Sequence, residues 1–261
     1  MSGSDLGPPD DPMHAEFDTV AGWTADVALD LGPDSFLVAG CRGSASPGAL
    51  RWLLDRLDAG TSDRLLDCGA GVGGPAAFAA SEVGVRPVLT EPEHEACRAA
   101  RRLFGLPVVL AASRLPFGPE TFDVAWSLGV LCTVPDQPEL LAELRRVLRP
   151  GGRLGLLVFV AQTDRLEDPP TGNASPTEAR LEELLDGAGL AVVDSASAAD
   201  FAASPAWWQQ QEAAVEAELE ARHGDDAAWQ TAKQQSAAIG RLLESGELAG
   251  RLLVARPRKE S

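Results

Sequence analysis

Apolar residues recur with a helical period through the first part of the chain. They predict two or three helices from residue 15 to about residue 59, with breaks at Gly32-Pro33 and around residues 40–48. The clearest of these helices begins at Pro47, because proline is well placed in the first turn of a helix. Its apolar side is formed by Leu50, Leu53, Leu54 and Leu57. The pattern therefore predicts a helical cap that precedes every strand.

A regular alternation of apolar runs and amphipathic stretches follows the cap. The apolar runs predict strands at 64–68, 86–90, 108–110, 122–126 and 153–160, and the amphipathic stretches predict helices at 72–82, 92–104 and 138–148. The segment Arg149-Pro150-Gly151-Gly152 is expected to end a helix and turn into the next strand. A helix at 176–187 and strands at 190–194 and 251–255 complete the pattern. It indicates an α/β fold, Rossmann-like, with a mostly parallel sheet covered by helices on both faces.

Residues 200–246 differ in character from the alternating region. They are rich in Ala, Gln and Glu, contain Trp207, Trp208 and Trp229, and predict two helices separated near Gly224. Their apolar stripes are narrow, which is typical of helices that cover another part of a protein. We therefore divide the chain into a disordered tail (1–12), a helical cap (13–60), a sheet domain (61–199 and 247–257) and a helical lid insertion (200–246).

Charge and cysteine content narrow the classes of function. The chain has 261 residues, with 22 basic and 39 acidic side chains and a net charge of −17. Such a field repels phosphate backbones and anionic membranes, so we expect no nucleic-acid or membrane partner and a neutral or cationic small-molecule substrate. The cysteines (Cys41, Cys68, Cys97 and Cys132) have no spacing typical of a metal site, and no segment resembles a signal peptide or a membrane span. These features predict a cytoplasmic protein.

A glycine-rich turn after the first predicted strand carries the strongest chemical signal. Asp67 precedes Gly69, Gly71, Gly73 and Gly74, and glycines in such a turn let a ligand approach the backbone closely. The spacing fits both G-x-G-x-G and the G-x-G-x-x-G of dinucleotide enzymes. Glu91 ends the next predicted strand, about 20 residues on, where an acid can accept hydrogen bonds from both hydroxyls of a ribose. The turn alone predicts a nucleotide-like cofactor and leaves its identity open.

Three further segments resemble one family when they are taken together with this turn. They are Leu115-Pro116-Phe117, Phe122-Asp123-Val124-Ala125-Trp126-Ser127, and Leu144-Arg145-Arg146-Val147-Leu148-Arg149-Pro150-Gly151-Gly152-Arg153-Leu154. In this order and spacing they resemble the class I S-adenosylmethionine-dependent methyltransferases, particularly the small-molecule branch that includes the ubiquinone/menaquinone C-methyltransferases. The resemblance implies a seven-stranded sheet with S-adenosylmethionine bound across its carboxyl ends.

The resemblance also implies roles for individual residues. Gly69, Ala70 and Gly71, in the turn that continues to Gly73, would pass under the methionine and ribose, while Asp67 would orient the methionine amino group. Glu91 would hold the ribose and Pro92 would lie against the adenine. Ser127 and Leu128, just past the fourth strand, would line the site near the sulfonium. Arg42 is a candidate partner for the methionine carboxylate, although a plain surface position explains it equally well.

The chain departs from the family pattern at three places. Ala111 and Ala112 replace an Asp-Ala pair whose carboxylate accepts from the adenine amino group, so Ala112 and Ser113 would hold the adenine by backbone and hydroxyl. The segment Leu131-Cys132-Thr133-Val134-Pro135-Asp136 lacks the histidines that many relatives carry there. Phe17 stands where relatives have a tyrosine in the segment that folds over the cofactor, and the chain contains no tyrosine.

Methyl transfer is an in-line displacement that requires an aligned acceptor and exclusion of water, and a general base helps when the acceptor is a hydroxyl or a cationic amine. His14 and His223 are the candidate bases, because they lie in the two segments expected to cover the site.

A protein that binds the cofactor without methylating is the alternative function. An NAD-dependent oxidoreductase is less favoured, because the turn follows a long helical cap and no Tyr-x-x-x-Lys pair exists. The acceptor atom and the oligomeric state stay open.

Overall fold

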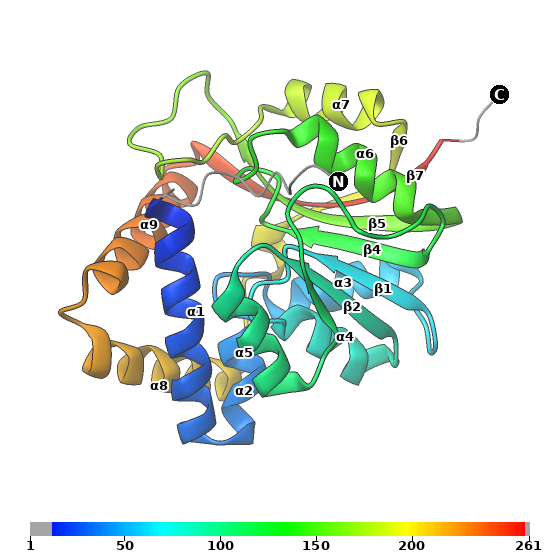
Figure 1. Ribbon diagram of the computed structural model, residues 1–261. Coiled ribbons are helices and arrows are strands. Elements are labelled where there is room, and N and C mark those ends of the chain that lie inside the picture. Colours follow the sequence, from blue (N-terminus) through cyan, green and yellow to red (C-terminus); the bar gives the residue numbers. More distant parts are fainter. Residues whose placement is uncertain (1–11, 259–261) are drawn as a thin grey trace, which may run out of the picture.

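The computed structural model describes residues 12–258, with side chains from residue 15, and these residues fold around one seven-stranded sheet (Figure 1). The strand order is β3-β2-β1-β4-β5-β7-β6, with β7 antiparallel to both of its neighbours. The strands are β1 (Arg64–Cys68), β2 (Arg86–Glu91), β3 (Val108–Leu110), β4 (Phe122–Leu128), β5 (Leu148–Ala161), β6 (Leu190–Ser197) and β7 (Leu248–Pro257). The expected mostly parallel α/β sheet is confirmed.

Helices cover both faces of this sheet, because its central strands are apolar on both sides. The helices that follow or separate the strands are α4 (Gly74–Val83), α5 (His94–Phe104), α6 (Gln137–Val147) and α7 (Glu178–Gly187). Leucines of α6 and α7 pack with Leu66 and Leu156 on one face, and α3 and α4 pack with Leu65 and Trp126 on the other.

The cap consists of α1 (Pro12–Leu31), α2 (Pro33–Gly40) and α3 (Pro47–Leu57). The breaks fall where the sequence predicts them, at Gly32-Pro33 and after Gly40. Ser46 begins α3 by accepting the backbone N–H of Ala49, and Pro47 occupies the first turn. Residues 1–11 of the expected tail lie outside the described residues, and Pro12, the last residue assigned to that tail, already begins α1.

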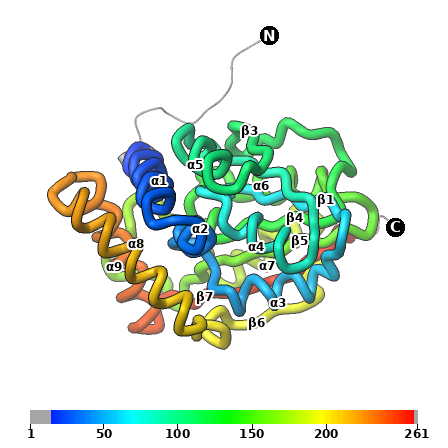
Figure 2. Tube along the Cα trace, turned by 90° about the horizontal axis from the view of Figure 1, so that it is seen from below, coloured from blue at the N-terminus to red at the C-terminus, as the bar shows by residue number. Residues whose placement is uncertain are grey.

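The segment between β6 and β7 contains η1 (Ala198–Phe201), α8 (Ala206–His223) and α9 (Ala227–Glu244). Figure 2 shows α1 lying between α5 and the pair α8 and α9. Val20 and Val27 of α1 share a buried cluster with Leu103 of α5, Leu219 of α8 and Trp229 of α9. The insertion therefore packs against the cap and shares a core with it. None of the helices in residues 12–258 combines the length and the apolar character that crossing a membrane requires.

The structure corrects the expected end of β4 and the expected start of β5. Ser127 and Leu128, expected just past the fourth strand, are the last residues of β4, because both pair with β5 at Leu156 and Leu157. The strand β5 begins at Leu148 instead of 153, because Leu148 already pairs with Phe122. The ladder then shifts register and resumes at Val124 and Arg153. The Pro-Gly-Gly segment is thus an irregularity within a strand.

Candidate functional site

The glycine turn joins the carboxyl end of β1 to α4. Gly69, Gly71 and Gly73 have φ angles of 73°, 53° and 88°, in the left-handed region that favours glycine. The backbone N–H groups of Gly69 and Ala70 both donate to the carbonyl of Thr90, at 2.9 and 3.0 Å. The turn is therefore tied to β2, and its backbone lies at the edge of the sheet where parallel α/β proteins bind ligands.

The backbone of the cap lies in direct contact with the glycine turn. A Cβ placed on Gly74 would overlap the backbone of Gly40 and Cys41 at the end of α2. Over the turn itself, Phe17 of α1 places its Cζ 3.4 Å from the position of a Cβ on Gly71, and Val130 lies against Gly69. The cap and the loop after β4 therefore cover the turn closely.

Asp67 lies in β1 directly before the turn. Its side chain is only 1% exposed, and its Oδ2 has no hydrogen-bond partner. Burial raises the pKa of the Asp67 carboxyl to about 7, although the indole of Trp126 and the backbone N–H of Ala76 lower it. Trp126 is the β4 residue in register with Asp67, and its Nε1 also has no partner. The indole is thus near enough to stabilise the charged carboxylate, but neither Asp67 Oδ2 nor Trp126 Nε1 has a partner of standard hydrogen-bond geometry.

Glu91 ends β2 on the other side of the turn. Its Oε2 accepts the backbone N–H of Gly71 at 2.7 Å, and its Oε1 accepts that of Glu93 at 3.2 Å. Burial raises the pKa of Glu91 to about 7, against the lowering effect of these two N–H groups. The carboxyl group is therefore held at the turn by backbone donors that a ligand hydroxyl could replace.

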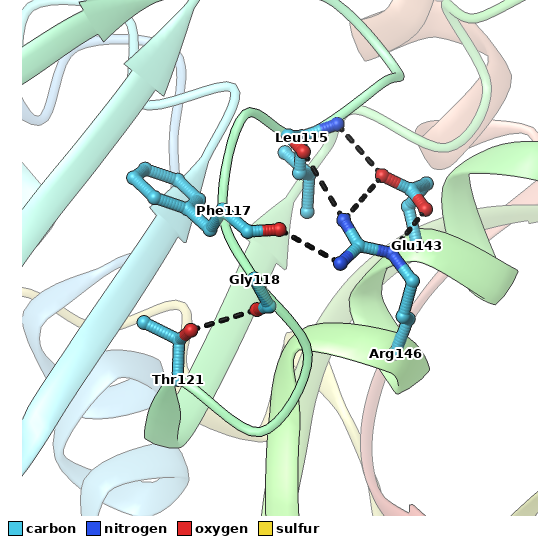
Figure 3. A network of polar contacts seen from close by, with 6 residues as sticks. All are labelled: Leu115, Phe117, Gly118, Thr121, Glu143 and Arg146. Carbon is cyan, nitrogen blue, oxygen red and sulfur yellow. Dashed lines mark hydrogen bonds and ion pairs between the residues drawn. The ribbon is translucent and has the colours of Figure 1, made fainter.

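Two of the segments that carry the family resemblance, 115–117 and 144–154, contact each other through side chains of α6. As Figure 3 shows, the guanidinium of Arg146 donates to the carbonyls of Leu115 and Phe117, while Glu143 accepts the backbone N–H of Leu115. Glu143 and Arg146 also form an ion pair, and this pair lowers the pKa of Glu143. The loop after β3 is therefore fixed to α6, which explains why these two segments occur together in the sequence.

Comparison with known proteins agrees with this geometry. Residues 66–156 match a family profile described as "Methyltransferase domain". This segment is therefore similar to methyltransferase domains. The chain is 33% identical over 146 residues to "Methyltransferase GfsG" of Streptomyces halstedii, covering 51% of this chain and 52% of that protein. It spans about half the length of the curated relatives it matches.

Two solved structures share the fold of this chain. The cyclopropane synthase MmaA2 of Mycobacterium tuberculosis superimposes with a TM-score of 0.69 at 17% identity, covering 97% of this chain and 99% of that one. A SAM-dependent methyltransferase of Geobacter sulfurreducens in complex with S-adenosylhomocysteine gives a TM-score of 0.59 at 19% identity, covering 82% and 92%. At these identities the likeness concerns the fold alone.

The other residues expected to bind a cofactor follow the strands of the sheet. Pro92 comes directly after β2, and Ala112 and Ser113 come after β3. Ser127 is 1% exposed and its hydroxyl donates to the carbonyl of Cys68 at 3.1 Å. The Ser127 side chain therefore joins β4 to the end of β1 within the sheet. Strand order brings all of these positions to the same edge as Asp67 and Glu91.

Arg42, the expected partner of a methionine carboxylate, lies just after α2. Its Nε donates to Oε2 of Glu216 on α8 at 3.0 Å, and its guanidinium carbon lies 4.9 Å from the centre of the Trp229 ring. These contacts join the cap to the insertion. The role of Arg42 toward a carboxylate stays a prediction.

Of the two histidines proposed as bases, only His223 has a side chain among the described residues. The side chain of His14 lies outside the described residues. His223 stacks on Trp23 of α1 with ring centres 3.8 Å apart, and its Nδ1 lies 3.1 Å from Oδ2 of Asp226. These contacts explain His223 as a tie between α8 and α1, and its assignment as a base stays a prediction.

The two neighbouring tryptophans of the insertion differ in burial. Trp208 is buried with Leu252 and Leu54 and anchors α8 beside the sheet, whereas Trp207 is 53% exposed. Sequence reasoning missed Glu16, a buried acid on α1. The only available signal was its place directly before Phe17-Asp18, the segment expected to fold over the cofactor.

Proposed function

We propose that this protein is an S-adenosylmethionine-dependent methyltransferase that acts on a small-molecule acceptor. The observation that carries the proposal is the pair of buried carboxyl groups on either side of the glycine turn, Asp67 with an unpartnered oxygen and Glu91 bonded to the turn. An amino group and a ribose diol are the donors that such a pair accepts. The match of residues 66–156 to a methyltransferase domain supports the same cofactor.

The residues at this edge fit the parts of S-adenosylmethionine. Asp67 would hold the methionine amino group, and Glu91 would accept from the ribose hydroxyls in place of the N–H of Gly71. Pro92, Ala112 and Ser113 would surround the adenine. The bound cofactor supplies a methyl group on a positively charged sulfur, without any phosphate. The acidic edge suits such a cation.

The chain itself contributes alignment and exclusion of water. Phe17 and Val130 lie against the glycines of the turn, so cofactor entry would displace both side chains and their return would close the site. The helices α8 and α9, packed on the cap, would act as the lid on the acceptor side. His14 and His223 stay the candidate bases, and the ring of His223 would leave its stacking contact with Trp23 to act as one.

The substrate class follows from charge. With a net charge of −17, the protein favours neutral or cationic small molecules. The quinone C-methyltransferase branch and a cytoplasmic location are narrower proposals. The first is supported by the sequence resemblance, and the second by four buried cysteines that are free thiols.

Calorimetry with S-adenosylmethionine and with NAD tests the cofactor. We expect micromolar binding of the first and none of NAD, and tight NAD binding would overturn the proposal. Release of S-adenosylhomocysteine is then measured against a panel of phenols, amines and carbon acids, which also reveals the acceptor atom.

A second candidate is a protein that binds this cofactor and performs other chemistry. It is favoured by the Ala111-Ala112 pair and by the segment 131–136, which lack the acid and the histidines of many relatives. The fold is also that of a protein named a cyclopropane synthase. Cofactor binding without methyl transfer to any member of the panel would support this candidate.

A further inference from the structure

Asp67 and Trp126 are neighbours on two adjacent strands in the middle of the sheet. They are in register where β1 pairs in parallel with β4, so their side chains leave the same face of strands about 4.8 Å apart. Leu65 and Val124 form the pair two residues earlier and share a buried apolar cluster with Trp126. Asp67 is 1% exposed and Trp126 is fully buried. The carboxyl group of Asp67 therefore borders an apolar cluster next to the indole.

Each of these two side chains has a buried polar atom without a hydrogen-bond partner. The atoms are Oδ2 of Asp67, which accepts, and Nε1 of Trp126, which can only donate. Burying an indole N–H without a partner costs free energy, and a phenylalanine would fill an apolar core without that cost. Packing alone therefore does not explain why a tryptophan stands at this position.

The strand on the other side of Trp126 offers no side-chain acceptor. Its register partner on β5 is Gly155, and a Cβ placed there would lie 3.2 Å from Leu57 and 3.4 Å from Leu53, both on α3. Leucines thus fill the space over Gly155. Of the two residues in register with Trp126, only Asp67 has a side chain that can accept the indole N–H.

The charge of Asp67 is sensitive to this neighbour. Burial raises the pKa of the Asp67 carboxyl to about 7, and the indole of Trp126 acts in the opposite direction, followed by the backbone N–H of Ala76. A donor with this effect favours the negative form of the carboxyl group. The negative form is the one that pairs strongly with a positively charged amino group.

We infer that the indole N–H of Trp126 hydrogen-bonds the Asp67 carboxylate when the methionine amino group of the cofactor is bound, and so positions that carboxylate. This inference rests on the proposed function, in which Asp67 accepts from the amino group. One carboxylate oxygen then accepts from the indole and the other from the ligand. Trp126 is a positioning residue, because it is fully buried and acts through Asp67. The arrangement selects ligands that carry the amino group.

Two ligands that differ in the methionine part test this by calorimetry. S-Adenosylhomocysteine carries the amino and carboxylate groups, whereas 5′-methylthioadenosine lacks both and keeps the adenosine and the sulfur. Trp126→Phe retains an aromatic ring and removes the N–H. We expect it to weaken binding of S-adenosylhomocysteine about tenfold, by loss of a charge-assisted hydrogen bond, and to change binding of 5′-methylthioadenosine by less than about twofold.

A double-mutant cycle shows whether Trp126 acts through Asp67. Asp67→Ala should itself lower the affinity ratio of the two ligands, and Trp126→Phe added to it should change the ratio little further, because no carboxylate is left to position. Trp52→Phe is the matched control. It makes the same change on α3, where Trp52 packs against the same apolar cluster, and should leave both affinities unchanged.

A measurement on the wild-type protein keeps the test decisive if a variant folds poorly. In protein labelled with ¹⁵N, the Nε1–H signal of Trp126 should move downfield when S-adenosylhomocysteine is added, because a hydrogen bond to the carboxylate forms. The same signal should stay in place with 5′-methylthioadenosine.

The outcomes separate the two proposals. Three results overturn the role of Trp126 while the methyltransferase proposal stands: an unchanged affinity ratio in Trp126→Phe, an equal effect of this substitution in the Asp67→Ala background, or an indole signal that does not respond to S-adenosylhomocysteine. Failure of the wild-type protein to bind S-adenosylhomocysteine overturns the proposed function itself.

Discussion

The glycine turn and the junction between cap and insertion lie next to each other but are built in different ways. The turn consists of the contiguous residues 67–74, and its shape follows from backbone conformation and one anchoring carbonyl, that of Thr90. The junction is assembled from distant residues: Arg42 with Glu216, Trp23 with His223, and Asp30 with Arg222 at 2.6 Å. The proposed cofactor side is thus encoded locally, whereas the proposed acceptor side depends on long-range packing.

We expect the largest effect on stability at the contact between the glycine turn and the end of α2 in the cap. Gly74→Ala places a Cβ against the backbone of Gly40 and Cys41, which cannot move without shifting α2. We expect a loss of about 3 kcal/mol or more in the free energy of unfolding, measured in urea. Gly187→Ala at the end of α7 meets no atom within 4 Å and serves as the control. Equal stabilities would mean that the cap does not pack on the turn.

A change confined to the turn should affect the cofactor and spare the junction. Glu91→Ala removes the carboxylate at the ribose position and should weaken S-adenosylmethionine binding by about 1–3 kcal/mol. Calorimetry measures the effect, with Glu182→Ala, at an exposed position of α7, as the matched control. Unchanged affinity in Glu91→Ala would show that the ribose assignment is wrong.

The pH dependence of stability reports on both regions together. Asp67, Glu91 and Glu16 have folded-state pKa values raised to about 7, so between about pH 4 and pH 7 the folded protein binds more protons than the unfolded chain. Stability should therefore fall as the pH rises through this range, by on the order of 1 kcal/mol or more per group. Melting temperatures at pH 5.5 and pH 8 check this. Asp67→Asn and Glu16→Gln should each flatten the profile, and a rise in stability toward pH 8 would contradict it.

The smallest expected effect is at the junction. Arg42→Met keeps the side-chain stem but removes the ion pair with Glu216 and the contact with Trp229, and should cost about 1 kcal/mol of stability. Arg51→Met is the matched control, because Arg51 likewise pairs with Glu82 and lies over Phe78, away from the site. If Arg42 also holds the methionine carboxylate, only its variant loses cofactor affinity.

The sequence predicts the fold well where local signals agree. The boundaries of β1 and β3 match the expected ranges, and proline and glycine mark both ends of α2 and α4 and the start of α3. The irregular start of β5 was missed, because Pro-Gly-Gly normally indicates a turn, and only pairing with β4 reveals that Leu148 already belongs to the strand.

The candidate site is predictable on one side only. Asp67, the glycines and Glu91 are found by spacing, since each is placed by the strand that precedes it. Glu16 carries no such signal, because a glutamate in an amphipathic helix is ordinarily exposed. Its burial arises from tertiary packing of α1, which no local pattern encodes.

By itself the sequence determined the order of strands and helices, the glycine turn and the two acids beside it, because each depends on neighbours a few residues away. Only the tertiary structure decided which residues cover that turn and which charges meet there. The pairing of Arg42 with Glu216 joins residues 174 positions apart, and the attraction between Glu16 and Arg42 joins residues 26 positions apart. The local sequence does not predict these contacts, because they form only when α8 packs against the cap.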